Sequence, residues 1–385
     1  MQPSRCILAF NRFYHVSRYT QPVFRSMRRP PPLHDTPKKI CVLRLSALGD
    51  VTHVIPLIRR IQDQWPACEI TWVCGVFEYK LLKLIEGVRF VLFDKKKGFT
   101  AYLNLRKDLR GEKFDVLLHM QVSARANLAS RFIRADKRLG WDRGRSRDFH
   151  HFFINHSVAE ATQQHQVDGF QSFGTALGLR ETTPCWNLPI TESAEKFVSR
   201  NIINNKPLFV ISACSSHALR NWSAKRYAAV ADYSVQAHGM LPVISGGPSA
   251  IEIETAEAIV ESMNCEAINL VGKDTLEQLI GLMNKAEVVL TPDSGPSHLA
   301  NAVGTAVIAL HACTWSKRSG PYSSLNYCVD KFEEAAKKYK NKSASELFWG
   351  TKIEQPGVMD LITVEEVCNK LDLVMLEKNE VQPQS

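Results

Sequence analysis

Short apolar runs alternate with amphipathic segments along most of this chain, and this alternation restricts the fold more than any other feature. Residues 40–45 are apolar apart from Arg44, and they precede residues 51–65, where apolar side chains recur at helical spacing. The same order repeats from Lys38 to Leu310. Because repeated strand–helix units favour parallel β-sheets covered by helices, the pattern predicts an α/β fold.

The length of the chain predicts about two domains. A chain of 385 residues exceeds what one hydrophobic core usually supports. Residues 182–191 contain two prolines and are interpreted as a linker. We expect two doubly wound domains at 37–181 and 192–362 that face a central cleft, followed by a C-terminal helix and tail at 363–385.

The periodicity also predicts individual elements, whereas residues 331–350 are charged and are expected to be irregular. The expected strands are 40–45, 69–73, 89–93, 114–119, 208–211, 240–244, 288–290 and 306–310, and the expected helices are 51–65, 79–85, 101–109, 224–236, 251–263 and 363–376.

Composition disfavours membrane-spanning and disulfide-rich classes of protein. No run approaches the ~18 consecutive apolar residues of a spanning helix. Ten cysteines occur without a C-x-x-C pair, which favours a reducing compartment. Four histidines lack metal-ligand spacing and are interpreted as surface or loop residues, namely His150, His151, His156 and His165.

The positive charge is concentrated in the first half of the chain. Residues 1–181 carry 30 lysines and arginines against 16 acidic residues, a balance of +14, and the remainder carries 18 against 23, or −5. An anionic lipid, a nucleic acid or an anionic sugar fits this asymmetry, and so does a solvated basic surface. Because no aromatic and basic module accompanies the charge, we expect no nucleic-acid partner.

Residues 1–36 form a separate basic extension that we expect to be flexible. They hold six arginines and no acidic residue before Asp35. An organellar transit segment, a basic membrane-surface arm and a reading frame that truly starts at Met27 all fit this composition.

The strand expected at 288–290 leads into a polar loop and a short helix. Ser294 suits the N-cap, Pro296 the first turn and Gly304 the C-cap of that helix. Such a helix start aims backbone N–H groups and the positive end of the dipole at one point, as phosphate binding requires. Asp293 lies at the C-terminal end of the strand, where open α/β sheets bind ligands. A purely structural capped turn is the alternative.

Asp50 lies in the loop S-A-L-G-D after the first expected strand. An N-cap and a general base facing the cleft both fit this position. The chain has neither the G-x-G-x-x-G fingerprint of dinucleotide binding nor a phosphate-binding P-loop motif. A D-x-D pair is also absent, so nothing suggests a divalent metal held by carboxylates.

Two further loops of the second half offer groups for a nucleotide. Ser215 and Arg220 follow the strand expected at 208–211 and supply a hydroxyl and a cation for a diphosphate. The glycines of residues 246–247 permit close approach of a ligand. Either Glu252 or Glu254, in the next helix, can accept hydrogen bonds from ribose hydroxyls.

In this order and spacing the motifs resemble a known family. S-A-L-G-D, G-G-P and T-P-D-S-G-P-S-H-L-A are similar to those of the ADP-heptose–lipopolysaccharide heptosyltransferases, over residues 38–325 and again at the tail 356–362. The resemblance implies an inverting GT-B glycosyltransferase with two Rossmann-like domains, the first holding the acceptor and the second the nucleotide sugar. It implies no catalytic metal and no cofactor, with ADP-heptose as the donor substrate.

The resemblance also assigns roles by motif position. Asp50 becomes the base that deprotonates the acceptor hydroxyl, and Arg220 a cation near the phosphates, where family members commonly carry lysine. The implied donor-binding residues are Ser215, Ser216, Arg220, Gly246, Glu252 (or Glu254), Asp293, Ser294, Gly295 and His298. The candidate acceptor contacts are Arg59, Arg60, Arg125 and Arg143, although a solvated helix face explains each of them equally.

The implied function is transfer of a heptose to the Kdo/heptose inner core of lipopolysaccharide, with the protein peripheral at the cytoplasmic face of the bacterial inner membrane. A family member with another nucleotide sugar or acceptor is one alternative. A catalytically silent nucleotide-sugar-binding relative is another, and the presence of both Asp50 and Asp293 disfavours it. A nucleotide-sugar epimerase shares the architecture but not these motifs. The sequence does not distinguish addition of the first heptose from addition of the second.

Overall fold

The computed structural model describes residues 36–381, so the basic extension predicted at 1–36 lies outside the described residues except for its last position. In the first half the elements are β1 (Lys39–Leu43), α2 (Leu48–Gln64), β2 (Glu69–Gly75), α3 (Tyr79–Leu82), β3 (Val88–Phe93), η1 (Lys95–Lys97), α4 (Thr100–Asp108), β4 (Phe114–His119), α5 (Ala124–Ser130), β5 (Ala135–Gly140), η2 (His150–Phe153), β6 (His156–Ser157) and α6 (Gln166–Ala176).

The second half begins with a helix and then repeats the strand–helix alternation. Its elements are α7 (Glu192–Asn201), β7 (Leu208–Ile211), η3 (Ala218–Arg220), α8 (Ala224–His238), β8 (Leu241–Ile244), α9 (Ala250–Ser262), β9 (Ile268–Asn269), α10 (Leu276–Lys285), β10 (Val288–Pro292), α11 (Gly295–Ala302), β11 (Ala306–His311), α12 (Ser316–Ser319), η4 (Tyr322–Tyr327), β12 (Val329–Asp330), α13 (Phe332–Lys340), η5 (Ala344–Glu346), η6 (Val358–Leu361) and α14 (Val364–Val381).

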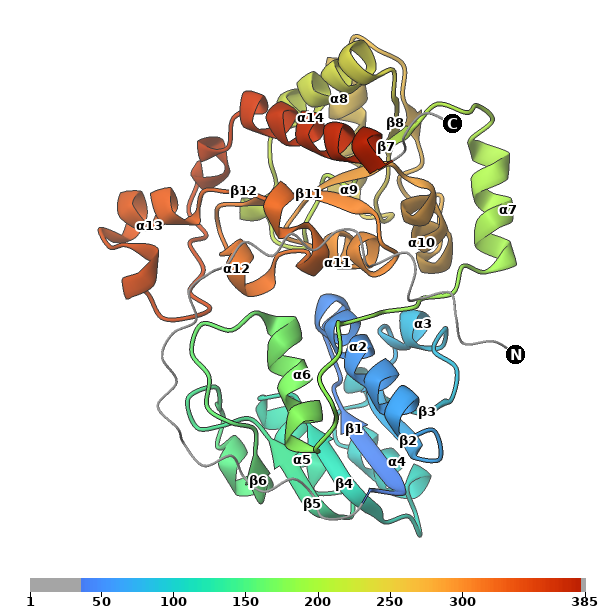
Figure 1. The fold of residues 1–385 in the computed structure, drawn as a ribbon, viewed down its shortest axis with the longest axis vertical. Coiled ribbons are helices and arrows are strands. Elements are labelled where there is room, and N and C mark those ends of the chain that lie inside the picture. Colours follow the sequence, from blue (N-terminus) through green and yellow to red (C-terminus); the bar gives the residue numbers. More distant parts are fainter. Residues whose placement is uncertain (1–35, 382–385) are drawn as a thin grey trace. The chain divides into compact units, whose positions relative to one another are not determined.

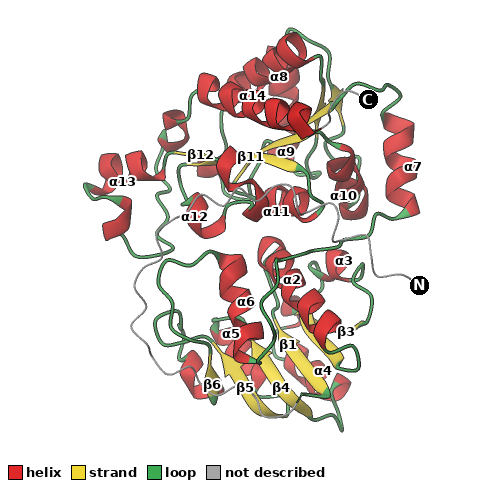
Figure 2. Cartoon of the chain, viewed as in Figure 1, coloured by secondary structure: helices red, strands yellow, loops and turns green. Residues whose placement is uncertain are grey.

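Each half contains one parallel sheet (Figure 1). The order is β3-β2-β1-β4-β5-β6 in the first sheet and β12-β11-β10-β7-β8-β9 in the second. In the first sheet the chain runs outward from β1 to β3 and then continues with β4 on the other side of β1. In the second sheet it runs outward from β7 to β9 and continues with β10 on the other side of β7. The direction of the strand order therefore reverses at β1 and at β7. Helices flank the strands of both sheets (Figure 2). The predicted α/β class with doubly wound parallel sheets is confirmed.

Alternating side chains bury both faces of the central strands. In β1, Ile40 and Val42 join the apolar cluster under α2 and α6, whereas Cys41 and Leu43 join the cluster under α4 and α5. The period of two along a strand sends successive side chains to opposite faces, so a strand that is apolar throughout fits only between two layers of helices. This explains why continuous apolar runs mark the strands in the sequence.

The structure contradicts the expectation that residues 331–350 are irregular. Helix α13 begins at Phe332, and its buried residues are Phe332, Ala335 and Ala336. These positions follow the i, i+3, i+4 spacing of one helix face. The high density of lysine and glutamate on the other face hides that short apolar stripe in the sequence.

The expected linker packs against the first half instead of standing in solvent. Trp186 is buried, and its indole Nε1–H donates to the carbonyl oxygen of Thr52 on α2 at 2.9 Å. The exact boundaries at 181/182 and 191/192 stay a prediction.

Among residues 36–381, the structure has no helix with the length and apolarity needed to span a bilayer.

Candidate active site

Asp50 lies at the start of α2, directly after the C-terminal end of β1. Ala47 occupies the N-cap, so Asp50 is the third residue of the helix and not its cap. Its Oδ2 accepts a hydrogen bond from the backbone N–H of Ala47 at 3.2 Å and pairs with Nη2 of Arg44 at 2.5 Å. The Asp50 side chain keeps 26% of its surface exposed, which leaves a face of the carboxylate accessible to a substrate.

The start of α2 packs directly against α11 of the second half. A Cβ atom added to Gly49 would lie 2.6 Å from Cδ2 of His298, which is closer than real Cβ contacts. One added to Gly295 would lie 3.4 Å from Cδ2 of Leu48. The glycine beside Asp50 therefore permits the close approach of the two halves, and it brings Asp50 to the loop that precedes α11.

We expect Gly49→Ala to destabilise the protein by about 1–3 kcal/mol, because the new methyl group must displace the His298 ring in a packed contact. The free energy of unfolding from denaturant titration measures this cost. In a His298→Ala background the same substitution should cost much less, since the ring that it meets is gone. An equal cost in both backgrounds would contradict the contact.

Three buried histidines continue this contact between the halves. His53 on α2 places Nε2 3.0 Å from Nδ1 of His298, and its ring centroid lies 6.0 Å from that of His165. His165 caps α6 by accepting the N–H of Val167 at Nδ1, and its Nε2 lies 3.0 Å from the carbonyl oxygen of Gly320. Burial lowers the pKa of all three imidazoles. Neighbouring histidines act in the same direction, whereas the Asp293 and Asp50 carboxylates oppose the effect at His298.

The structure corrects the interpretation of His150, which is buried in η2 and is neither a surface nor a loop residue. His165 does lie in a loop, at the N-cap of α6, but it is buried. Burial lowers the pKa of each ring to about 4. Nε2 of His150 accepts the backbone N–H of Trp141, which requires a neutral ring. His151 and His156 are exposed, as predicted.

These buried rings predict acid destabilisation. The unfolded chain protonates His150 and His165 near the usual pKa of 6.5, whereas the folded chain does so only near pH 4. The unfolded state therefore binds more protons between these values, and the free energy of unfolding falls as pH drops from 6.5 to 4, by about 3 kcal/mol for each ring. Denaturant titrations across this range measure the slope.

Two variants separate this effect from general acid sensitivity. His165→Asn keeps a side chain able to cap α6 but removes the titrating ring, so the slope should become shallower. His156→Gln, at an exposed position, should leave it unchanged. A slope that is the same in the wild type and in His165→Asn would show that His165 does not cause it.

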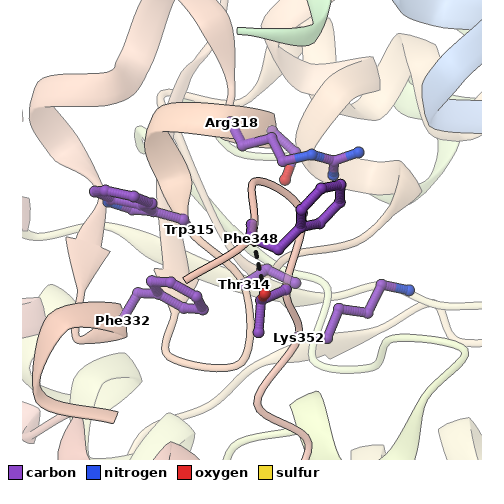
Figure 3. A pocket seen from close by; sticks show the side chains of 9 residues that line it. Thr314, Trp315, Arg318, Phe332, Phe348 and Lys352 are labelled. Carbon is purple, nitrogen blue, oxygen red and sulfur yellow. Dashed lines mark hydrogen bonds between the residues drawn. The ribbon is translucent and has the colours of Figure 1, made fainter. Parts of the chain in front are cut away.

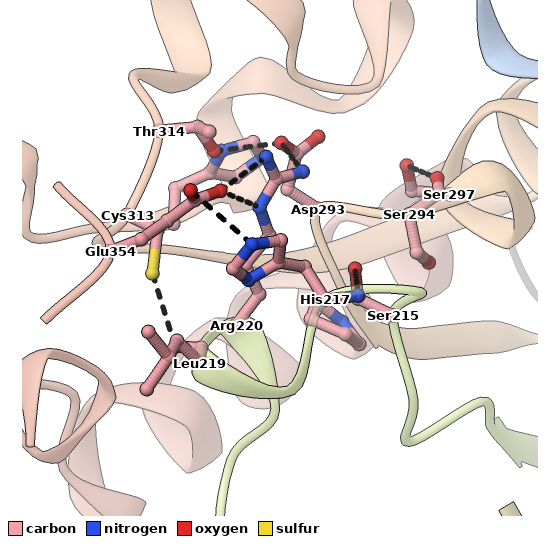
Figure 4. Close-up of polar contacts among 12 residues, drawn as sticks. Ser215, His217, Leu219, Arg220, Asp293, Ser294, Ser297, Cys313, Thr314 and Glu354 are labelled. Atoms are coloured by element: carbon pink, nitrogen blue, oxygen red, sulfur yellow. Dashed lines mark hydrogen bonds and ion pairs between the residues drawn. The ribbon is translucent and has the colours of Figure 1, made fainter. Parts of the chain in front are cut away.

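Arg220 bridges two carboxylates on the second half (Figure 4). Its Nε and Nη2 donate to Oε1 of Glu354 at 3.2 and 2.9 Å, and its Nη1 lies 3.4 Å from Oδ2 of Asp293. The hydroxyl of Thr314 donates to the same Asp293 oxygen at 2.8 Å. Burial alone would raise the pKa of Asp293, but the fields of His311 and His298, the Thr314 hydrogen bond and Arg220 outweigh it and hold the pKa below its usual value.

The loop after Asp293 forms the helix start that the sequence predicts. Ser294 is the N-cap residue of α11, Pro296 lies in the first turn, and Gly304 has a positive φ of 83° just beyond the helix. The Ser294 hydroxyl does not cap the helix, because it pairs with the hydroxyl of Thr291 at 2.9 Å. The N-terminus of α11 therefore follows Asp293 directly, and its dipole favours negative charge there.

The other donor candidates lie on neighbouring loops at the same sheet edge. Ser215 is buried, and its hydroxyl accepts the N–H of His217 at 3.3 Å, whereas Ser216 is exposed. Glu252 accepts the backbone N–H of Gly247 at 2.7 Å. Glu254, two residues later in α9, is exposed. Of the two acidic candidates, Glu252 is the one that contacts the glycine loop.

The predicted acceptor arginines divide into two groups. Arg60 is buried and donates to the carbonyl oxygens of Arg180, Gln171 and Leu179, so it holds α2 against α6 instead of facing an acceptor, contrary to the prediction. Arg59 donates similarly to the linker carbonyls of Trp186 and Asn187. The remaining two candidates, Arg125 and Arg143, are exposed.

Sequence reasoning missed Arg44, Glu354 and Arg318. Arg318 lines a small pocket with Thr314, Phe348 and Lys352 (Figure 3), and its Nε would lie 3.2 Å from a Cβ on Gly350. Burial lowers the pKa of Arg318, while the Asp50 and Asp293 carboxylates act in the opposite direction. The only sequence signal for Arg318 was a cation shortly after the strand expected at 306–310.

Asp274 was missed as well. Its Oδ2 is buried without a hydrogen-bond partner, and burial raises the pKa of its carboxyl to about 6, with Glu252 contributing in the same direction. Asp274 thus adds a second acidic side chain beside the Gly246–Gly247 loop.

Comparisons with known proteins show the family to which the chain belongs. The sequence matches the model of glycosyltransferase family 9 (heptosyltransferase) over residues 102–348. The lipopolysaccharide core heptosyltransferase OpsX of Haemophilus influenzae is 36% identical over 89% of this chain and 98% of its own length.

Solved structures share the fold, which confirms the predicted GT-B architecture. A family 9 glycosyl transferase of Veillonella parvula has a TM-score of 0.72 at 23% identity, covering 88% of this chain and 97% of that one. The ADP-heptose lipopolysaccharide heptosyltransferase II of Escherichia coli has a TM-score of 0.66 at 18% identity, covering 89% and 99%. Together with the family match and the OpsX relative, they show that the chain is a glycosyltransferase and belongs to glycosyltransferase family 9, the heptosyltransferases.

Proposed function

We propose that this chain transfers a heptose from ADP-heptose to the Kdo/heptose inner core of lipopolysaccharide, with inversion and without a metal ion. Family membership and the name of the OpsX relative support the substrate class. The observation that carries the proposal is the contact of Gly49 with His298, which brings Asp50 of the first half to Asp293 and the N-terminus of α11 in the second. In this proposal Asp50 is the base and the N-terminus of α11 is the site for the leaving phosphate, and they lie on opposite sides of the contact between α2 and α11.

In the proposed reaction, Asp50 takes the proton of the acceptor hydroxyl. The oxygen then attacks the anomeric carbon of the heptose while the bond from that carbon to the phosphate oxygen breaks, and ADP leaves with the electron pair. A single displacement of this kind inverts the anomeric configuration. General-base assistance of this type contributes about 10²–10⁴-fold to a rate.

The charge that develops on the departing diphosphate needs stabilisation, and two groups are suited to it. The N-terminus of α11 provides backbone N–H groups and the positive end of its dipole. Arg220 provides a guanidinium that is already held by Asp293 and Glu354 and needs little reorganisation. In this proposal they replace a metal ion, and Asp293 and Glu252 contact the sugar and ribose hydroxyls.

The acceptor is proposed to be anionic and carried by a lipid, with the protein peripheral at the cytoplasmic face of the inner membrane. The basic balance of residues 1–181 supports an anionic acceptor on the first half. Arg125 and Arg143 are the exposed acceptor candidates, and Arg318 and Arg44 add cations close to Asp50.

The test is a transfer assay with purified full-length protein, ADP-heptose and Kdo–lipid A, read by mass spectrometry. We expect a mass gain of one heptose, an inverted anomeric configuration by NMR, and the same rate after treatment with a chelator. Kdo–lipid A with and without one heptose distinguishes first from second transfer. No mass gain with either acceptor would falsify the proposed substrates, and a chelator-sensitive rate would contradict metal independence.

A further inference from the structure

The segment that follows β3 presents an uncovered face. Lys95, Lys96 and Lys97 form η1 and are all exposed, and Asp94 caps this turn by accepting the N–H of Lys96 at 3.0 Å. Phe99, next to the start of α4, keeps 66% of its surface exposed. Three adjacent ammonium groups thus lie beside an exposed aromatic ring, so this segment is both basic and apolar at its surface.

Helix α4 extends this face. Its inward side carries Ala101 and Leu105, which are buried in the apolar cluster against the sheet. Its outward side carries Leu103, which is 48% exposed, followed by an exposed basic group consisting of Arg106, Lys107 and Arg110. Phe99 and Leu103 are four residues apart and so share one side of the helix.

We propose that residues 95–110, here called the η1–α4 face, dock the protein on a membrane surface that contains anionic lipid. Six cations accompany two exposed apolar side chains on this face, with Asp108 as the only acidic residue of the segment, and this composition suits an element that lies in the plane of a bilayer interface. The lysines and arginines meet lipid phosphates, and Phe99 and Leu103 enter the boundary between headgroups and acyl chains. A nucleic acid would use the cations but would leave the two apolar side chains in water.

The position of the η1–α4 face suits the proposed acceptor, and this argument rests on the proposed function. In the register of the sheet, Gly75 of β2 pairs with Phe93 of β3, and Leu43 of β1 pairs with Val73 of β2. The segments that follow β1 and β3, and that lead to Asp50 and Lys95, therefore leave the same sheet edge two strands apart, which corresponds to about 10 Å across the sheet. A lipid-borne sugar at a membrane touching this face lies within reach of Asp50.

The experiment measures sedimentation of the full-length protein with vesicles of phosphatidylcholine alone or mixed with phosphatidylglycerol. We expect binding to the mixed vesicles only. Lys95→Gln/Lys96→Gln/Lys97→Gln should weaken it about 100-fold, since each cation near an anionic surface contributes about 1 kcal/mol. Phe99→Ser/Leu103→Ser should weaken it about tenfold through lost apolar burial.

The matched control removes three exposed lysines from α13 instead, as Lys337→Gln/Lys338→Gln/Lys340→Gln. It should bind vesicles like the wild type. Hydrogen exchange of the wild type should slow in residues 95–110 when mixed vesicles are added. Equal binding by all variants, or exchange that slows elsewhere but not in this segment, would overturn the proposal.

Two further measurements distinguish failure of the membrane-docking proposal from failure of the proposed heptose transfer. With a water-soluble, short-chain acceptor and no membrane, both η1–α4 variants should keep wild-type turnover. Loss of vesicle binding with that turnover intact supports docking, whereas absence of transfer in the wild type refutes the reaction alone. Binding to duplex DNA that depends on the three lysines but not on Phe99 and Leu103, together with no vesicle binding, would identify a different partner.

Discussion

Asp50→Asn is expected to lower kcat for heptose transfer by about 10²–10⁴-fold, because an amide cannot take the proton of the acceptor hydroxyl. The substitution keeps the size of the side chain and an oxygen that can accept the N–H of Ala47, so α2 should still form. Initial rates with saturating ADP-heptose and varied acceptor measure kcat, and KM for the donor should change little.

Asp63→Asn is the matched control for Asp50→Asn, since Asp63 lies on the same helix and is exposed. It should keep the wild-type kcat. Circular dichroism and the free energy of unfolding should be alike for both variants, apart from the loss of the ion pair with Arg44 in Asp50→Asn. Full turnover by Asp50→Asn would remove Asp50 as the base even if heptose transfer itself is established.

The fold was predictable because the strands are buried on both faces. A strand such as β1 that lies between two helical layers must be apolar throughout, and that requirement is visible in a single sequence. Helix α6 was not predictable in the same way. It contains Gly169 and Gly174, which weaken helix propensity, and it forms because those glycines admit Trp141 on one side and Leu57 and Arg60 on the other.

Some residues of the candidate site could also be placed from the sequence, and others could not. The positions of Asp50 and Asp293 were predictable because each follows the C-terminal end of a strand, and parallel strands bring such segments to one edge. The sequence did not distinguish Glu252 from Glu254. Glu354 was not predictable, since it lies in an irregular segment far from any strand-to-helix loop, and only the folded chain brings it to Arg220. Likewise, nothing in the spacing of Arg60 distinguishes an arginine that binds carbonyl oxygens from one that faces a ligand.

Arg220→Ala is expected to lower kcat/KM for ADP-heptose by about 10²–10³-fold, the usual cost of removing one preorganised group that stabilises developing charge. The loss should exceed that of a simple ion pair, because Asp293 and Glu354 would remain without the cation and would repel the diphosphate. Initial rates with varied ADP-heptose measure kcat/KM, and calorimetric titration with ADP measures the loss of binding.

Arg220→Lys separates charge from geometry. One ammonium can neutralise a carboxylate but cannot reach both Glu354 and Asp293 as the planar guanidinium does, so an intermediate loss is expected. Lys225→Ala, an exposed cation at the start of α8, should keep wild-type kinetics. If Arg220→Ala bound ADP like the wild type and lost only stability, the role of Arg220 would be to hold Asp293 and Glu354 together, and the diphosphate would depend on the N-terminus of α11 alone.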